Sequence, residues 1–296
     1  MNIILGGGIT ALIWAYYNKE HFIVSDQIGG QMSSNFDLGP RYLHNKQPYV
    51  TNFLNSLHMS IKHRLIRIGY IDDSGWVSNP DLQFRQNYYM KSRGTTDISG
   101  FDNTVLNTNI KEFKVCDVDF KELVFRLFED VSDRIYSGKV TKIDLQEQTI
   151  STDTNLSIKF KNMVSTIPLK IFSSIANLNL DLKSSTMSYC LVSDSFFDLK
   201  GFDYVYDARS STYCHRMTKC KQGIVCDVSD NNIFCFLNAQ DGFLPLELKT
   251  VKNNQIISLD KDFELEKHPE IKFVGRYGSW HRRWKTETAI EEAQSA

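Results

Sequence analysis

Residues 2–26, which read NIILGGGITALIWAYYNKEHFIVSD, decide the fold of this chain. The short apolar run that ends at Leu5 predicts a buried strand. Three glycines follow, and residues 9–18 then predict an apolar helix. Residues 21–25 predict a second buried strand, which ends at Asp26. This order of strand, glycine turn, helix and strand indicates a βαβ unit with parallel strands.

The glycine turn has the spacing of a dinucleotide-binding motif. Gly6 permits a tight turn, Gly8 lets the backbone approach a pyrophosphate, and Ala11 lets the helix pack closely on the strand. The first N–H groups of the helix, at Ile9 and Thr10, offer the positive end of the helix dipole to phosphates. The turn therefore predicts a phosphate-binding site at the start of this helix.

Asp26 supplies the second part of that site. It stands eighteen residues after Gly8, at the end of the second predicted strand. A carboxylate there can accept hydrogen bonds from the hydroxyls of a ribose. We expect Asp26 and its neighbours Ser25 and Gln27 to contact the cofactor. This context favours a dinucleotide site over a glycine-rich turn in a non-binding α/β fold.

Composition excludes several other classes of protein. The chain has 296 residues and a formal net charge of −1, so bulk charge does not favour a protein that coats nucleic acid. No stretch is long and apolar enough to predict a membrane-spanning helix. Six cysteines with no C-x-x-C pair indicate a reduced, cytoplasmic chain. The even spacing of Cys214, Cys220 and Cys226 is compatible with a metal site, but buried thiols are the ordinary interpretation, and we expect no metal.

The rest of the sequence predicts two interleaved domains. Helical spacing of apolar residues in 119–134 and strand-like segments in the second half indicate a mixed architecture. We expect an α/β Rossmann-like domain made of residues 1–48, 134–172 and 268–296. An α+β substrate domain would then comprise residues 49–133 and 173–267. Both domains are discontinuous in sequence.

The segment after Asp26 carries a resemblance to a known family. Residues 28–34 read IGGQMSS and residues 36–44 read FDLGPRYLH. They resemble the Gly-Gly loop and the following glycine-basic stretch of flavoproteins in the amine oxidase and UDP-galactopyranose mutase superfamily. Many members have an arginine after the two glycines, whereas this chain has Gln31. The resemblance implies that FAD is the cofactor and that the following residues contact it: Gly30, Gln31, Met32, Gly39, Pro40 and Arg41.

The resemblance extends to three later segments. Residues 138–168 resemble the strands by which the family's chain returns to the Rossmann sheet, which implies cofactor contacts from Val140 and Thr166. Residues 273–280, FVGRYGSW, resemble the mutases' Gly-Arg motif, and a closing helix follows from Thr286. The implied cofactor contacts in this segment are Gly275, Arg276, Lys285 and Thr286. Trp280 replaces the usual tyrosine.

Three residues are candidates for contact with the substrate or the reacting atoms: Arg216, Arg41 and Trp280. Residues 213–218, YCHRMT, resemble a mutase strand whose arginine lies near the flavin and the substrate phosphates, with one extra residue here. A guanidinium suits that role because it is always charged and binds anions in a forked geometry. A strand arginine that merely faces solvent is the competing interpretation.

The leading hypothesis is an FAD-dependent oxidoreductase related to amine oxidases, with hydride transfer from a small amine or similar donor to flavin N5. The first alternative is a mutase that acts on a UDP-sugar, with Arg209 or Arg85 as the partner of Arg216. The second is a non-enzymatic nucleic-acid-binding module built on the basic and aromatic residues 272–285. We expect a small-molecule substrate and no membrane, and we do not expect nucleic-acid binding. The oligomeric state stays open.

Overall fold

The computed structural model describes most of the chain as two compact units. The residues described are 1–30, 42–44, 47–94, 96, 112–178, 180, 182, 184–229, 232–238, 245–256, 268–279 and 285–296. Unit 1 comprises Met1–His63, Cys116–Leu182 and Ser258–Ala296, and unit 2 comprises Arg64–Val115 and Lys183–Ile257. Among the described residues, no helix has the length and apolar character needed to cross a membrane.

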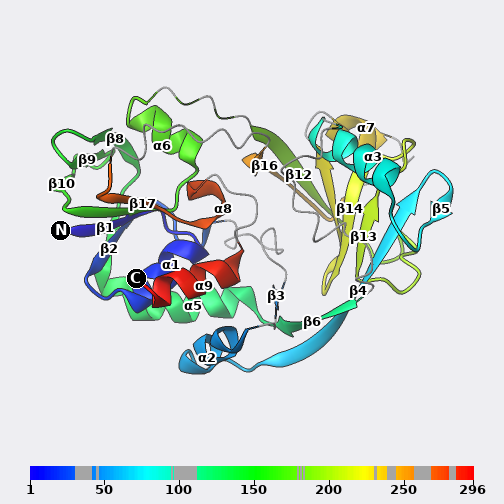
Figure 1. The fold of residues 1–296 in the computed structure, drawn as a ribbon, viewed down its shortest axis with the longest axis horizontal. Coiled ribbons are helices and arrows are strands. Elements are labelled where there is room, and N and C mark those ends of the chain that lie inside the picture. The colour runs from blue at the N-terminus through cyan, green and yellow to red at the C-terminus, as the bar shows by residue number, and fades with distance from the viewer. Residues whose placement is uncertain are drawn as a thin grey trace. The chain divides into compact units, whose positions relative to one another are not determined.

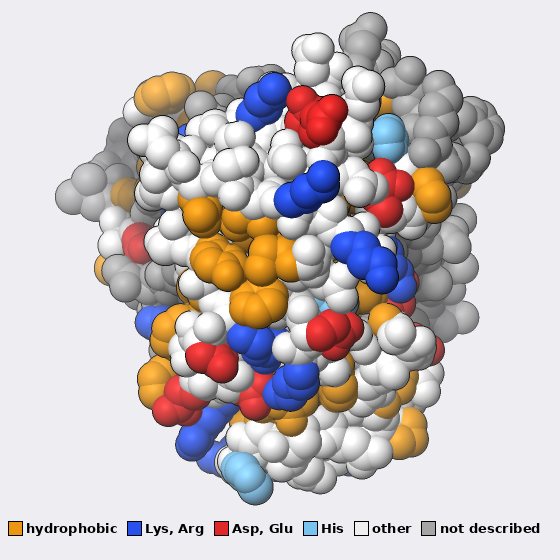
Figure 2. Space-filling model, turned by 90° about the vertical axis from the view of Figure 1, so that its left-hand side faces the viewer, with side chains coloured by type: hydrophobic (Ala, Val, Ile, Leu, Met, Phe, Trp, Pro, Cys, Tyr) orange, Lys and Arg blue, Asp and Glu red, His pale blue; other side chains and the backbone are white. Residues whose placement is uncertain are grey.

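The surface is mixed in charge, in keeping with the near-neutral composition. Figure 2 shows one face of the molecule, on which basic and acidic side chains are interspersed around a central group of hydrophobic ones. No continuous basic area is formed by the described residues on that face.

Unit 1 is built on a five-stranded parallel sheet with the strand order β17-β11-β1-β2-β7 (Figure 1). Its strands are β1 (Asn2–Leu5), β2 (His21–Ser25), β7 (Ile135–Ser137), β11 (Asn162–Ser165) and β17 (Ile271–Phe273). The unit also contains a three-stranded antiparallel sheet. Its strands are β8 (Val140–Asp144), β9 (Thr149–Thr152) and β10 (Ser157–Lys159). The predicted βαβ unit is confirmed, with β1 and β2 as parallel neighbours.

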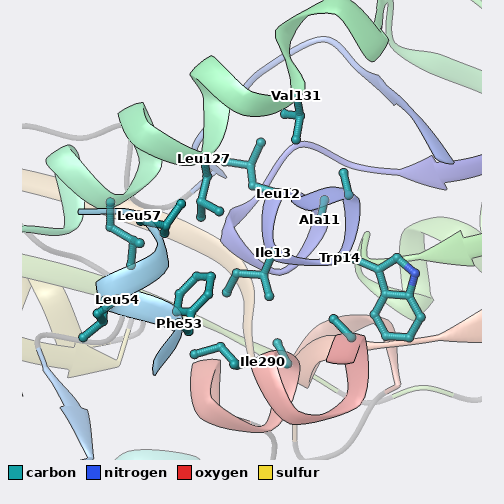
Figure 3. Packing of buried hydrophobic residues seen from close by; sticks show 14 of the residues in the cluster. Ala11, Leu12, Ile13, Trp14, Phe53, Leu54, Leu57, Leu127, Val131 and Ile290 are labelled. Atoms are coloured by element: carbon teal, nitrogen blue, oxygen red, sulfur yellow. The ribbon is translucent and has the colours of Figure 1, made fainter. Parts of the chain in front are cut away.

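Unit 1 contains the helices α1 (Ile9–Tyr17), α2 (Pro48–Ser56), α5 (Phe120–Val131), α6 (Leu169–Ile175), α8 (Gly275–Gly278) and α9 (Thr286–Gln294). Of these, α2, α5 and α9 pack around α1. Residues 11–15 of α1 are all buried, because α5 and α9 pack against a helix that also contacts the sheet (Figure 1). Figure 3 shows Leu12, Ile13 and Trp14 among side chains of α2, α5 and α9. A helix enclosed in this way has no polar face, which explains its uniformly apolar sequence.

This packing corrects the expected domain boundary. Residues 49–63, 116–133, 173–182 and 258–267, which we expected in the substrate domain, fall in unit 1. The reason is hydrophobic: Phe53 of α2 and Leu127 of α5 are fully buried in the same cluster as α1. An amphipathic helix belongs to the unit that covers its apolar face.

Unit 2 contains a mostly antiparallel sheet, and its described residues also form two helices. Its strands run in the order β16-β12-β15-β14-β13-β4, and β5 pairs with β4. They are β4 (Lys62–Asp72), β5 (Gly75–Trp76), β12 (Ser184–Val192), β13 (Tyr204–Asp207), β14 (Cys214–Cys220), β15 (Gly223–Ser229) and β16 (Glu247–Ile256). The helices are α3 (Leu82–Arg93) and α7 (Ile233–Asn238). β4 and β6 (Glu112–Asp117) carry the chain between the units.

The two faces of this sheet differ in chemistry. One face is a hydrophobic core in which Cys190, Cys214 and Cys226 are buried with side chains of α7. Two of the three evenly spaced cysteines thus behave as small buried hydrophobes. On the other face Tyr70 and Tyr206 stack at 5.7 Å between ring centroids and meet α3 residues. The fold class predicted from the sequence, an α/β Rossmann-like domain with an interleaved α+β domain, is confirmed.

Arg134 joins α1, α5 and β2 in the interior of unit 1. Its Nη1 donates to the carbonyl oxygens of Ala15 at 3.0 Å, Lys19 at 3.1 Å and His21 at 3.2 Å. These carbonyls lie at the end of α1 and in the turn to β2, where the backbone acceptors have no helical partner. The guanidinium also suits the negative end of the α1 dipole. Arg134 therefore fixes the end of the βαβ helix.

Replacing Arg134 with methionine should lower the free energy of unfolding by about 3 kcal/mol, because several buried acceptors lose a charged donor. Urea unfolding followed by circular dichroism measures this change. Arg126→Met on the exposed face of α5 is the control, since its ion pairs with Glu122 and Glu129 are surface pairs. That variant should lose less than about 1 kcal/mol. Equal losses in the two variants would contradict the assigned role of Arg134.

Candidate functional site

The turn after β1 is held by close backbone packing. A Cβ on Gly6, whose φ is +98°, would lie 2.6 Å from Thr166 Oγ1. A Cβ on Gly7 would lie 2.2 Å from the carbonyl oxygen of Gln27. No side chain larger than hydrogen fits at either position without moving the neighbouring segments. Both glycines are thus required by the protein's own packing.

Gly8 differs from these two glycines. Its φ of −71° and ψ of 173° are accessible to any residue. An added Cβ would meet no atom of the described residues within 4 Å. Gly8 is also the N-cap of α1, which has no side-chain cap and no acidic residue in its first turn. Neither conformation nor packing requires a glycine here, so its lack of a side chain leaves open the approach to the first N–H groups of the helix.

The second glycine segment lies directly beside the first. The N–H of Gly29 donates to the carbonyl oxygen of Gly7 at 2.8 Å, and Gly8 and Gly29 form a parallel bridge. A Cβ on Gly30, whose φ is +56°, would lie 3.1 Å from Gly8 Cα. Two motifs that are about twenty residues apart in sequence therefore form one surface at the start of α1.

The end of β2 lies next to this surface. Ser25 Oγ donates to the carbonyl oxygen of Gln27 at 2.8 Å, which shapes the turn. Asp26 is exposed, and its carboxylate forms no hydrogen bond or ion pair within the described part of the chain. The N–H of Gly138 donates to the carbonyl oxygen of Ser25 at 3.1 Å, so the turn that leads to Val140 passes close by. The predicted ribose-side residues are thus brought together.

The C-terminal segment completes the arrangement within unit 1. A Cβ on Gly275, whose φ is +78°, would lie 3.1 Å from Thr10 Oγ1, and one on Gly278 would lie 2.6 Å from the Ser165 carbonyl oxygen. Thr166 Oγ1 donates to the carbonyl oxygen of Leu5 at 2.8 Å. The start of α1 and the turn at α8 therefore meet at the carboxyl ends of β1 and β11. Open α/β sheets bind their ligands at this edge.

Helix α9 begins with charged groups that contact the residues before α2. Lys285 is its exposed N-cap, and Nζ of Lys285 lies 3.4 Å from Nε2 of His44. Glu287 is buried, and its Oε1 accepts a hydrogen bond from the backbone N–H of His44. Burial raises the pKa of Glu287, while the His44 N–H and the charges of Lys285 and Arg276 oppose that rise. Sequence reasoning missed Glu287, although its place in the first turn of the predicted helix was visible.

Several predicted site residues cannot be placed in this surface. Six lie outside the described residues: Gln31, Met32, Gly39, Pro40, Arg41 and Trp280. Arg216 lies in unit 2, on β14, where it forms an ion pair with Asp227 of β15. The sequence analysis did not single out Asp227. The feature that could have indicated it is a single charged residue inside the apolar strand sequence GIVCDVS.

Solved structures resemble this chain, although no family model and no curated protein match it. The reduced form of UDP-galactopyranose mutase superposes with a TM-score of 0.73 at 12% identity, over 99% of this chain and 92% of the other. Cyclohexylamine oxidase from Brevibacterium oxydans gives 0.70 at 10% identity, over 100% and 97%. Putrescine oxidase with bound putrescine gives 0.62 at 10% identity, over 99% and 97%.

The chain has the fold of UDP-galactopyranose mutase and the amine oxidases. The resemblance seen in the sequence motifs is thus confirmed at the level of the fold. The mutase and both oxidases match nearly the whole chain, whereas the sequence motifs did not cover residues 80–135. At about one identity in ten residues, the shared architecture rests on packing and topology rather than on conserved sequence.

The buried carboxyl of Glu287 should make stability depend on pH. Because its folded-state pKa is raised, the protonated form favours the folded state, and stability falls as pH rises above the ordinary glutamate pKa of about 4.3. The Glu287→Gln variant has no carboxyl group to ionise at this position, so its stability should not fall for this reason as the pH rises. The Tm of the variant relative to that of the parent protein should therefore increase between pH 4.5 and pH 7.5. Thermal melts at both pH values measure the change. Glu291→Gln, one turn further on α9 and exposed, is the control, and a pH-independent difference for Glu287→Gln would contradict the prediction.

Proposed function

We propose that this chain binds FAD and acts as an oxidoreductase on a small amine or a similar donor. The observation that carries the proposal is the open space at Gly8, at an uncapped helix start and beside a second glycine turn. A Cβ would fill this space without touching any described atom of the protein. A diphosphate is the group whose size and charge fit such a space.

The residues around Gly8 suit the diphosphate and the adenosine end of a dinucleotide. The first N–H groups of α1, at Ile9 to Ala11, would donate to the diphosphate, and Gly30 would let the backbone lie against it. Asp26 would accept hydrogen bonds from the adenosine ribose. Ser25, Gln27 and Val140 would surround this end. The open, exposed carboxylate of Asp26 supports that assignment.

The C-terminal segment would serve the other end of the cofactor. Gly275 and Thr166 hold this segment against the α1 turn by close packing. Arg276 and Lys285 are exposed cations on the same segment. Thr286 begins a helix whose dipole would stabilise negative charge on the cofactor. By resemblance, Gln31, Met32, Gly39, Pro40, Arg41 and Trp280 belong to the same proposal.

Bound FAD would supply the redox chemistry, because flavin N5 accepts a hydride from a carbon–hydrogen bond. The protein's part is to bind, to orient and to tune charge. The uncapped start of α1 and the cations at positions 276 and 285 would neutralise the diphosphate. Hydride transfer needs no protein nucleophile. A glycine-lined site with fixed positive charge would therefore hold the cofactor for the proposed reaction.

Gly8→Val should abolish FAD retention while the protein still folds, because a Cβ at this position meets no atom of the described residues within 4 Å. The visible absorption spectrum of the purified protein, with FAD added and then removed by gel filtration, measures retention. Gln47→Val is the matched control, since Gln47 is another exposed N-cap in unit 1 that makes no side-chain cap. A yellow Gly8→Val protein, or a colourless parent protein that stays without FAD, would overturn the proposal.

Asp26→Ala should weaken FAD binding by about 1.5–3 kcal/mol, the contribution of a hydrogen bond to a charged group. Asp26→Asn keeps a hydrogen-bond acceptor and should lose less. Quenching of flavin fluorescence during titration gives both dissociation constants. Asp194→Ala, an exposed aspartate of unit 2, is the control. Unchanged affinity in Asp26→Ala would remove this residue from the ribose site.

Two alternatives differ in substrate. A mutase would interconvert the ring forms of UDP-galactose when the protein is reduced. If an amine bleaches the flavin and no such interconversion occurs, the protein is an oxidoreductase and not a mutase. A nucleic-acid module would use residues 272–285, of which the structure describes 272–279 and 285. Its oligonucleotide affinity would fall steeply with salt. The interspersed charges of Figure 2 do not favour that alternative on the face shown.

A further inference from the structure

The inference concerns the buried carboxyl group of Glu287 in the first turn of α9. Helix α9 packs against α1, α2, α8 and the short strand β3 (Leu43–His44), and Glu287 is only 8% exposed. Oε1 of Glu287 accepts a hydrogen bond from the backbone N–H of His44. A carboxyl oxygen can accept this bond in the ionised and in the protonated form. The hydrogen bond therefore fixes the position of the group and leaves its charge free to change.

Two exposed cations act on this carboxyl group. Lys285 is the N-cap of α9, and Arg276 lies in α8, which contacts α9. Their charges favour the ionised form of Glu287 and lower its pKa, whereas burial favours the neutral form and raises the pKa by more. The positive end of the α9 dipole also favours the ionised form. The carboxyl group thus lies beside the positive groups that the proposed function assigns to the cofactor.

Three other titratable groups of the described residues lie around Glu287. Nε2 of His44 lies 3.4 Å from Nζ of Lys285. Tyr49 of α2 donates to Oε2 of Glu291, which stands one turn further along α9, at 3.4 Å. Burial and these two glutamates raise the pKa of Tyr49 to about 12, so its hydroxyl stays neutral near pH 7. An imidazole ordinarily titrates near neutral pH, so the test needs a control for His44.

An anion that engages Lys285 and Arg276 would change the balance of charge at Glu287. It would offset part of the positive charge that favours the ionised carboxylate, and its own negative charge would repel that carboxylate. Both effects favour the protonated form, which burial already favours. By linkage the reverse also holds, because protonation of the carboxylate increases the affinity for the anion by the same factor.

We infer that FAD binding is coupled to the uptake of a proton by Glu287, so that the site binds its cofactor more tightly as the pH falls. The proton comes from the solvent and forms an O–H bond on the carboxylate, and no electron is transferred. The inference rests on the proposed function, since Arg276, Lys285 and the start of α9 must meet the negative charge of the cofactor. It deepens that function by naming how the same site is regulated.

Isothermal titration calorimetry of the full-length protein, freed of bound FAD and then titrated with FAD, tests the inference. FAD itself has no group that titrates between pH 5.5 and pH 7.5. The parent protein should bind FAD about fivefold more tightly at pH 5.5 than at pH 7.5. At pH 6.5 the heat of binding should differ between MES and Bis-Tris buffers, because the proton that is taken up leaves the buffer.

Glu287→Gln is the decisive variant, because it keeps an oxygen that can accept from the His44 N–H but cannot ionise. Its FAD affinities at the two pH values should agree within about twofold, and its binding heat should not depend on the buffer. Glu287→Ala, which also lacks the charge, provides a second measurement if the glutamine variant does not fold. Two controls should keep both the pH dependence and the buffer dependence of the parent protein. They are Glu291→Gln, the same substitution on the same helix, and His44→Gln, which removes the imidazole but not the backbone N–H.

The possible results separate the inference from the proposed function. Equal FAD affinity of the parent protein at both pH values would overturn the inference and leave the proposed function standing. Proton uptake that persists in Glu287→Gln would also overturn it, because another group would then take up the proton. A protein that binds FAD at neither pH would overturn both.

Discussion

The close packing of the Gly6–Gly8 turn against the segments after β2 and β11 is the constraint on which the candidate site depends. A Cβ at Gly7 would overlap the Gln27 carbonyl oxygen, and one at Gly6 would overlap Thr166 Oγ1. These contacts bring three strand ends within reach of one helix start. Gly8 is then left facing space that no atom of the described residues occupies. The site is therefore a consequence of how closely the backbone segments approach, and only secondarily of the side chains on its rim.

The helix that begins at this turn is fixed from all sides. Its apolar residues are enclosed by α2, α5 and α9, and Arg134 binds the carbonyl groups at its end. Packing of this kind holds the first N–H groups of α1 in place before any ligand binds. A helix start that is already ordered loses little entropy on binding a phosphate. The packing of the unit 1 core therefore also orders the candidate phosphate-binding site.

Unit 2 shows a different use of charge. Two of its arginines, Arg209 and Arg216, form ion pairs with the buried carboxylates of Asp207 and Asp227, and Lys91 shares Asp207. Removing the cation from either pair would leave a buried carboxylate without that partner, which is costly.

The sequence by itself determined the βαβ unit, the glycine motif and the Asp26 position, because these depend on contacts between residues close together in the chain. It also carried the family resemblance through motifs at 28–44 and 273–280. Only the tertiary structure decided that 49–63 and 116–133 belong to unit 1, since that depends on which core covers an amphipathic helix. It alone paired Arg216 with Asp227 and His44 with Glu287. Such pairs join distant residues, and no local pattern of charge or hydrophobicity specifies them.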